Sequence, residues 1–174
     1  ILCAALTKQD GMLAMVVPES WISRDYALVI KYMLLKFFDI QYIVEDLNSA
    51  WFHDVLVKTN LLIAKRIPFR DSLLTAQDLT YKHIKLSATL IGEHSLVDGL
   101  VYLGHTGRDG FIELLHGDAD TSGDGFDMKH ICMGDFVSEL KASRLLDKLE
   151  PDAMDLATAT IPKDLLDIIG IVPS

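Results

Sequence analysis

Residues 11–66 constrain the fold of this chain more than any other part of it. Met12 to Val17 are six consecutive apolar residues between a glycine and a proline, a pattern typical of a strand buried on both faces of a largely parallel sheet. Apolar residues then recur at helical spacing from Tyr26 to Phe37, which predicts a helix. Ile40–Val44 completes a strand, helix, strand unit, for which a right-handed crossover is expected.

A third strand is predicted over Val57–Ala64, which is again largely apolar. The segment Asp46–Leu56 before it is too short for a second helical crossover. The third strand should therefore pair antiparallel with Ile40–Val44. These elements predict an α/β fold in which the last strand of the sheet is antiparallel.

The charge of the chain is divided unevenly along its length. Residues 1–70 hold 8 Lys and Arg against 7 Asp and Glu, whereas residues 71–174 hold 8 against 18. A domain that binds nucleic acid by itself is normally basic, because phosphate contacts supply most of the nonspecific affinity. If the protein acts on DNA, its main contacts with DNA are expected outside residues 71–174.

Several other classes of protein and site receive little support. No apolar run approaches the roughly 20 residues of a membrane span, and no leader of secretory type is visible, so a cytoplasmic protein without membrane contact is expected. Cys3 and Cys132 are far apart, and neither they nor the histidines show the spacing of metal ligands. No metal site is predicted. The chain opens at Ile1, as expected for a piece of a longer protein.

Two segments hold candidate site residues. Pro18 and Glu19 follow the first strand at its carboxyl end, the edge where open α/β sheets place their ligands. Glu19 is either a residue of that site or a solvated acid in the first turn of the next helix.

The aromatic pair Trp51 and Phe52 stands in the polar segment between the second and third strands. Adjacent side chains of an extended segment point to opposite faces, so one ring is expected to be buried against the sheet and the other presented outward. The alternative is that the pair simply plugs the end of the sheet.

These segments together resemble a known family. GMLAMVVPES (residues 11–20), a long helix, AWFHD (50–54) and VKTNLLI (57–63) resemble the second half of the catalytic domain of N6-adenine DNA methyltransferases of restriction-modification and phage-defence systems. The resemblance covers roughly residues 1–70. It implies the distal part of a Rossmann-like methyltransferase sheet with an antiparallel last strand. A weaker similarity links segments between residues 141 and 170 to the connector that precedes target recognition in those enzymes.

The resemblance also implies roles for the candidate residues. A parent enzyme would transfer methyl from S-adenosylmethionine to adenine in DNA, with Phe52 stacking on the extruded base. Trp51 would be the buried plug, and Pro18, Glu19 and Trp51 could line the cleft. The family's glycine-rich cofactor turn and its Asn/Asp-Pro-Pro-Tyr/Phe motif do not occur in the 174 residues. This chain alone is therefore expected neither to bind the cofactor nor to methylate.

The rest of the chain is predicted with less detail. Residues 71–135 are interpreted as an insertion or small α+β lobe, and residues 136–174 as a helical connector towards a target-recognition domain. Alternating residues from His83 to Leu90 predict a half-exposed strand.

The segment Asp118–Asp127 has the spacing of a calcium-binding loop, but the last ligand position of such a loop is Lys129 instead of Glu. The segment is therefore interpreted as a mobile acidic surface loop. The glycine-rich segment 104–110 is predicted to lack both the buried strand before it and the helix after it that a phosphate or cofactor cradle needs.

Two hypotheses from different classes follow. The first is a fragment of a DNA adenine methyltransferase that carries the distal part of the catalytic sheet. The second is a noncatalytic α/β module that docks a protein partner through its acidic lobe. In the first case the apolar strand Met12–Val17 lacks a neighbour along its free edge, so self-association is expected.

Overall fold

The structure is a computed structural model, and it describes residues 6–24, 27–47, 51, 58–70 and 72–144. Phe52 and everything beyond Arg144 lie outside these residues. The strands are β1 (Met12–Pro18), β2 (Phe38–Asp46), β3 (Thr59–Arg66), β4 (Thr80–Leu86), β5 (Val101–Tyr102), β6 (His105–Thr106), β7 (Thr121–Gly123) and β8 (Phe126–Cys132). The helices are α2 (Ser20–Ser23), α3 (Leu28–Phe37), α4 (Gly107–His116) and α5 (Gly134–Ala142), with short 3₁₀ helices at Leu73–Ala76 and Ala88–Leu90.

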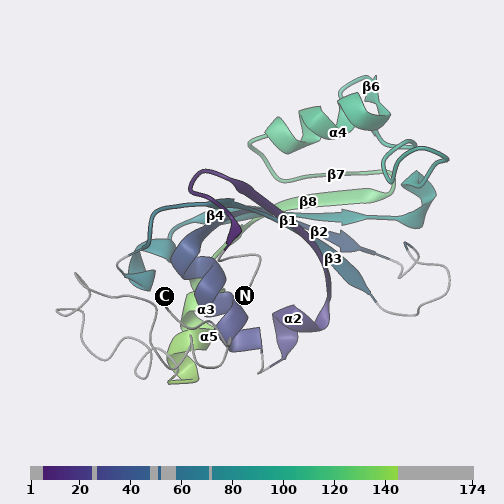
Figure 1. Cartoon of the computed structure of the whole chain (residues 1–174). Coiled ribbons are helices and arrows are strands. Elements are labelled where there is room, and N and C mark those ends of the chain that lie inside the picture. Colours follow the sequence, from purple (N-terminus) through teal and green to yellow (C-terminus); the bar gives the residue numbers. More distant parts are fainter. Residues whose placement is uncertain (1–5, 25–26, 48–50, 52–57, 71, 145–174) are drawn as a thin grey trace.

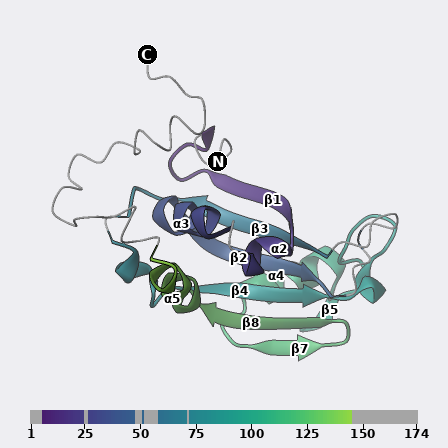
Figure 2. The same ribbon diagram turned by 90° about the horizontal axis from the view of Figure 1, so that it is seen from below.

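A mixed sheet of six strands, in the order β1-β3-β2-β4-β8-β7, forms the centre of an α/β fold. Strand β3 lies between β1 and β2 and pairs antiparallel with both, so β1 and β2 run in the same direction. The predicted strand, helix, strand unit and the antiparallel pairing of the third strand are confirmed. Figure 2 shows this order from below the sheet, with α3 lying under β2 and β3.

The sheet continues beyond residue 70. Strand β4 pairs parallel with β2, and β8 and β7 follow antiparallel. The predicted strand from His83 is confirmed as far as Leu86, whereas Ala88–Leu90 forms a 3₁₀ helix. The division of the chain at residue 70 stays a prediction, but strands from both sides of that division share one sheet.

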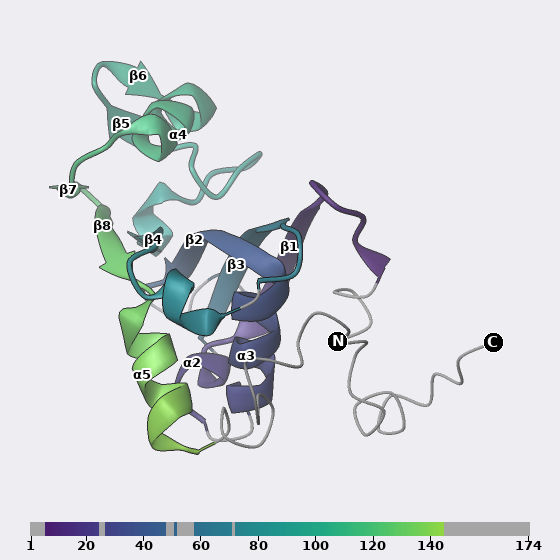
Figure 3. The same cartoon turned by 90° about the vertical axis from the view of Figure 1, so that its left-hand side faces the viewer.

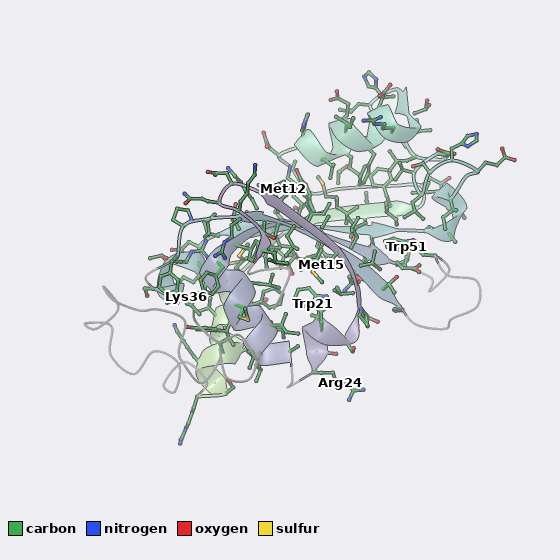
Figure 4. All side chains as sticks on the ribbon, in the orientation of Figure 1. Met12, Met15, Trp21, Arg24, Lys36 and Trp51 are labelled. Atoms are coloured by element: carbon green, nitrogen blue, oxygen red, sulfur yellow. The ribbon has the colours of Figure 1, made fainter. Side chains whose placement is uncertain are left out.

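Two apolar cores lie on opposite faces of the sheet, because side chains of a strand alternate between its faces. Helices α2, α3 and α5 cover the concave face, while α4 and the β5–β6 hairpin lie beyond the other face over β7 and β8 (Figure 1). Strand β2 contributes to both cores: Ile43 is buried on the helical side and Val44 on the α4 side. Figure 4 places Trp21 of α2 between that helix and the sheet, where it is 4% exposed.

The prediction that Met12–Val17 is buried on both faces is wrong. Strand β1 is the edge of the sheet, and its residues alternate between exposed and buried positions. Leu13 packs in the core on the helical side, whereas Met12 and Val16 are 54% and 56% exposed. The cause is that no described helix covers the outer face of β1. An unbroken apolar run therefore indicated a strand correctly without showing what covers it.

Two predictions about the acidic half of the chain are also corrected. Helix α4 begins at Gly107, inside the glycine-rich segment 104–110, which was expected to have no helix after it. Its buried residues Gly110 and Leu114 repeat at helical spacing. The segment Asp118–Asp127 is not an irregular loop, because β7 and β8 pair within it as a hairpin. Gly125, with φ +80°, lies in the turn between these strands, a conformation that glycine adopts without strain.

Candidate functional site

Strands β1, β2 and β4 all run in one direction, so their carboxyl ends meet at one edge of the sheet. Open α/β sheets bind ligands at such an edge. Strand β3 starts there, between the end of β1 at Pro18 and the end of β2 at Asp46. Neighbouring strands lie about 4.8 Å apart, so the ends of β1 and β2 are separated by roughly 10 Å. This edge is the candidate functional site.

Pro18 and Glu19 are tied to the start of β3. Pro18 pairs with Thr59 in the sheet register. The backbone amide of Glu19 donates a hydrogen bond to the carbonyl of Lys58 at 2.9 Å. Glu19 is half-buried and immediately precedes α2. The structure therefore places both residues at the predicted edge.

Trp51 is held on the other side of β3. Its backbone amide donates to Oδ2 of Asp46 at 2.9 Å, and Asp46 is fully buried at the end of β2. The half-buried Trp51 ring packs against the core on the α4 side, and its Nε1 is buried without a hydrogen-bond partner in the described part of the chain. In Figure 4 Trp51 lies near the ends of β2 and β3. Phe52, its predicted companion, lies outside the described residues.

Two polar residues between these positions were not predicted as site residues. Thr59 and Asn60 open β3, and Asn60 is fully buried. Neither the Thr59 hydroxyl nor either polar atom of the Asn60 amide has a hydrogen-bond partner in the described structure. Burial of such groups costs free energy unless they are satisfied. The signal in the sequence was the pair Thr-Asn at the head of an apolar strand, which was treated only as part of the resemblance.

A carboxylate and an imidazole face each other on the helical side of the same edge. Glu45 pairs with Asn60 in the register, and its Oε2 lies 2.9 Å from Nε2 of His83 and 3.8 Å from Nζ of Lys85. Burial lowers the pKa of His83 below its ordinary value, although Glu45 opposes that shift. Burial therefore favours the neutral form of His83, although one of its ring nitrogens lies beside a carboxylate. Sequence analysis noted His83 only as a strand residue, because the pairing of β4 with β2 was not foreseen.

The glycine-rich segment 104–110 makes contacts within the protein. The amide of Gly107 at the start of α4 already donates to the carbonyl of Leu100 at 2.7 Å. A Cβ at Gly110 would lie 2.7 Å from the carbonyl oxygen of His105. The absence of a side chain at Gly110 allows α4 to approach the β5–β6 hairpin closely, and the Gly107 amide already has a partner within the protein. Among the described residues, no group of three or more His, Cys, Asp or Glu side chains could hold a metal ion.

Comparisons with known proteins find several similar solved structures, among them two from type I restriction-modification systems. Neither a protein family nor a curated protein matches the sequence. The first structure is a modification subunit assigned to a type I restriction enzyme from Vibrio vulnificus YJ016, with 19% identity and a TM-score of 0.38, over 69% of this chain and 22% of that one. The second is from a type I restriction-modification system described for its complex assembly and conformational transition, with 14% identity and a TM-score of 0.43, over 96% and 37%. This chain thus spans well under half the length of either protein.

Within the described residues, no helix is long and apolar enough to cross a membrane.

Proposed function

We propose that this chain is part of a DNA methyltransferase and supplies the distal part of its catalytic sheet. The observation that carries the proposal is the arrangement of β1, β3 and β2. An antiparallel strand is inserted between two parallel strands that a helix connects. Two of the segments that resemble adenine methyltransferases, residues 11–20 and 57–63, lie largely on β1 and β3. The reaction would be transfer of methyl from S-adenosylmethionine to adenine N6 in DNA, with the cofactor turn and the amine-holding motif contributed by other parts of the parent protein.

The candidate site gives the described residues a positioning role in this reaction. The segment between β2 and β3 is anchored at both ends, by the bond from Trp51 to Asp46 and by the bond from Glu19 to Lys58. Trp51, as the plug, would fix the start of that segment against the sheet. Phe52 would then be presented to an extruded base, and Pro18 and Glu19 would line the same cleft. Stacking of a base on an aromatic ring contributes about 1–3 kcal/mol.

The proposal is tested in the parent protein with labelled S-adenosylmethionine and duplex DNA. Phe52→Ala should lower methylation by roughly tenfold to a hundredfold and leave cofactor affinity unchanged, because only base stacking is lost. Phe52→Trp, the matched control, should retain much of the activity. If Phe52→Ala methylates normally while Trp51→Ala abolishes base extrusion, reported by 2-aminopurine fluorescence at the target position, the two rings have been assigned the wrong way round. Absence of N6-methyladenine in DNA treated with the unaltered parent protein would refute the function itself.

A further inference from the structure

The tip of the β5–β6 hairpin combines two unfavourable features in one residue. Tyr102 pairs with His105, so Leu103 and Gly104 form a two-residue loop. Their φ angles are 51° and 83°, as in a type I′ turn, where Asn, Asp or Gly is strongly preferred at the first position. Leucine pays a steric cost at positive φ. Leu103 is also 73% exposed, and Val101, two residues earlier, is 61% exposed.

The hairpin is held firmly, so this tip is presented in a defined position. The amide of Gly107 donates to the carbonyl of Leu100, and the absence of a side chain at Gly110 lets α4 pack against His105. The ring of Tyr102 meets that of Phe126 edge-on at 5.9 Å, which anchors β5 to β8. Figure 3 shows the hairpin at the end of the molecule farthest from α3 and α5. A strained residue on a rigid support is a reason to look for function.

The surroundings of the tip indicate the kind of partner. Residues 87–125, which include the hairpin, α4 and β7, contain seven Asp and Glu but only one Lys or Arg, Arg108. From outside this segment, Lys82 of β4 also reaches α4, where its Nζ donates to the carbonyl of Leu115. The net charge of this segment is negative, which disfavours the phosphates of nucleic acids and of anionic membranes and favours a basic partner. An exposed apolar tip within an acidic surround is complementary to an apolar recess bordered by Lys and Arg.

We propose that Leu103 and Val101 form a docking knob that inserts into a basic protein surface with an apolar recess. The knob lies on the face of the molecule that carries α4, and the inference does not depend on the methyltransferase proposal. The rigid hairpin lowers the entropic cost of docking, and the acidic surround favours encounter with a basic partner.

The test uses the 174-residue chain and a fluorescein-labelled amphipathic helical peptide of leucine and lysine as the probe, followed by fluorescence anisotropy. Leu103→Asn should weaken binding of the peptide by about tenfold or more, because the apolar contact is lost. The same variant should melt at an equal or higher temperature, because asparagine suits the turn. Leu6→Asn is the matched control: Leu6 is 75% exposed and lies elsewhere in the chain, so binding should not change.

Three results would overturn the proposal. In the first, Leu103→Asn binds the peptide as tightly as the unaltered chain. In the second, Leu6→Asn loses as much affinity as Leu103→Asn, which would show that any exposed leucine suffices. In the third, the unaltered chain prefers neutral phosphatidylcholine vesicles, duplex DNA or a leucine and glutamate peptide over the lysine peptide. A lower melting temperature for Leu103→Asn would refute the premise that Leu103 is kept at a cost to stability.

Discussion

Lys31 shows how one charged residue is accommodated in the core beneath the sheet. It lies on α3, is 1% exposed, and its Nζ donates to the carbonyl of Ile22 and to Oε2 of Glu139, the latter at 2.6 Å. The ammonium also lies 5.3 Å from the centre of the Phe136 ring, a favourable cation–π geometry. Lys31 therefore joins α3 to α5 and to the end of α2.

The two partners of this ion pair should respond differently to mutation. Glu139→Ala leaves a buried ammonium with one fewer acceptor and should lower the free energy of unfolding by about 1–3 kcal/mol. Lys31→Met should cost less, because the side chain of Glu139 is 42% exposed and its carboxylate can remain solvated. Urea denaturation of both variants provides the measurement. Equal losses would contradict the idea that an unpaired buried ammonium is the main source of the cost.

His83 should make the stability of the fold sensitive to mild acid. Its folded-state pKa is lowered from 6.5, first by burial and then by Lys85, while Glu45 and Asp127 act in the opposite direction. As the pH falls through about 6.5, the unfolded chain takes up a proton that the folded chain resists, so the free energy of unfolding decreases. In His83→Gln the loss of stability between pH 7 and pH 5 should be smaller, measured by thermal melts across that range. An unchanged pH profile in this variant would place the acid sensitivity elsewhere.

At the scale of single residues, the sequence predicted the correct edge of the sheet for the site but not the polar residues that meet there. Pro18, Glu19 and Trp51 were chosen because they follow or precede strands, and strand ends can be read from local patterns. Glu45, Asn60 and His83 became neighbours only through the pairing of three strands. No local pattern contains that information, since it depends on which strands are adjacent.

Among the elements, the two edges of the sheet differ in how they are protected. Strand β7, at one edge, has three residues and no large apolar side chain. Strand β1, at the other edge, has seven residues, of which only the last is a proline, and carries no charge. Short, polar or charged edges resist pairing, whereas a long apolar edge promotes it. We therefore propose that β1 pairs with a further strand, either from the parent protein or from a second copy of this chain.

The edge of β1 should drive self-association of the isolated chain. Light scattering at high concentration is expected to show dimers or larger species. Met12→Lys combined with Val16→Lys should reduce them, because both side chains lie on the exposed face and are not part of the core. Lysine at the already exposed Leu79 serves as the control for added charge, because Leu79 immediately precedes β4, which β3 and β2 separate from β1. A clean monomer of the unaltered chain would favour a self-contained module over a part of a larger sheet.

The predicted elements succeeded or failed according to the range of the interactions behind them. The β1, α3, β2 and β3 segments were recognised because their patterns are local. Helix α4 was missed because glycines at its start suggested a loop, although Gly107 and Gly110 in fact allow it to pack against a hairpin. The β7–β8 hairpin was missed because its acidic residues were weighed as calcium ligands and not as the solvent-exposed side of a strand pair.

For the whole molecule, the main expectation concerns the cofactor. The purified chain should give no binding heat with S-adenosylmethionine at millimolar concentration, because the sequence lacks the turn that holds the methionine and ribose in the resembling family. The parent protein, titrated under the same conditions, is the positive control. A micromolar dissociation constant for the chain alone would mean that its place within the catalytic domain has been misassigned.

The central position of β2 has a consequence for how the molecule opens. Strand β2 is flanked by β3 on one side and β4 on the other, and its two faces reach both cores. Its amide protons can meet solvent only when the two halves of the sheet part from each other. Their exchange with deuterium should therefore be the slowest in the chain and should report the free energy of global unfolding, whereas the amides of β1 that point away from β3 should exchange through small local fluctuations. The strand that makes the molecule one cooperative unit is thus an interior one, separated by β3 from the edge at which a further strand would pair.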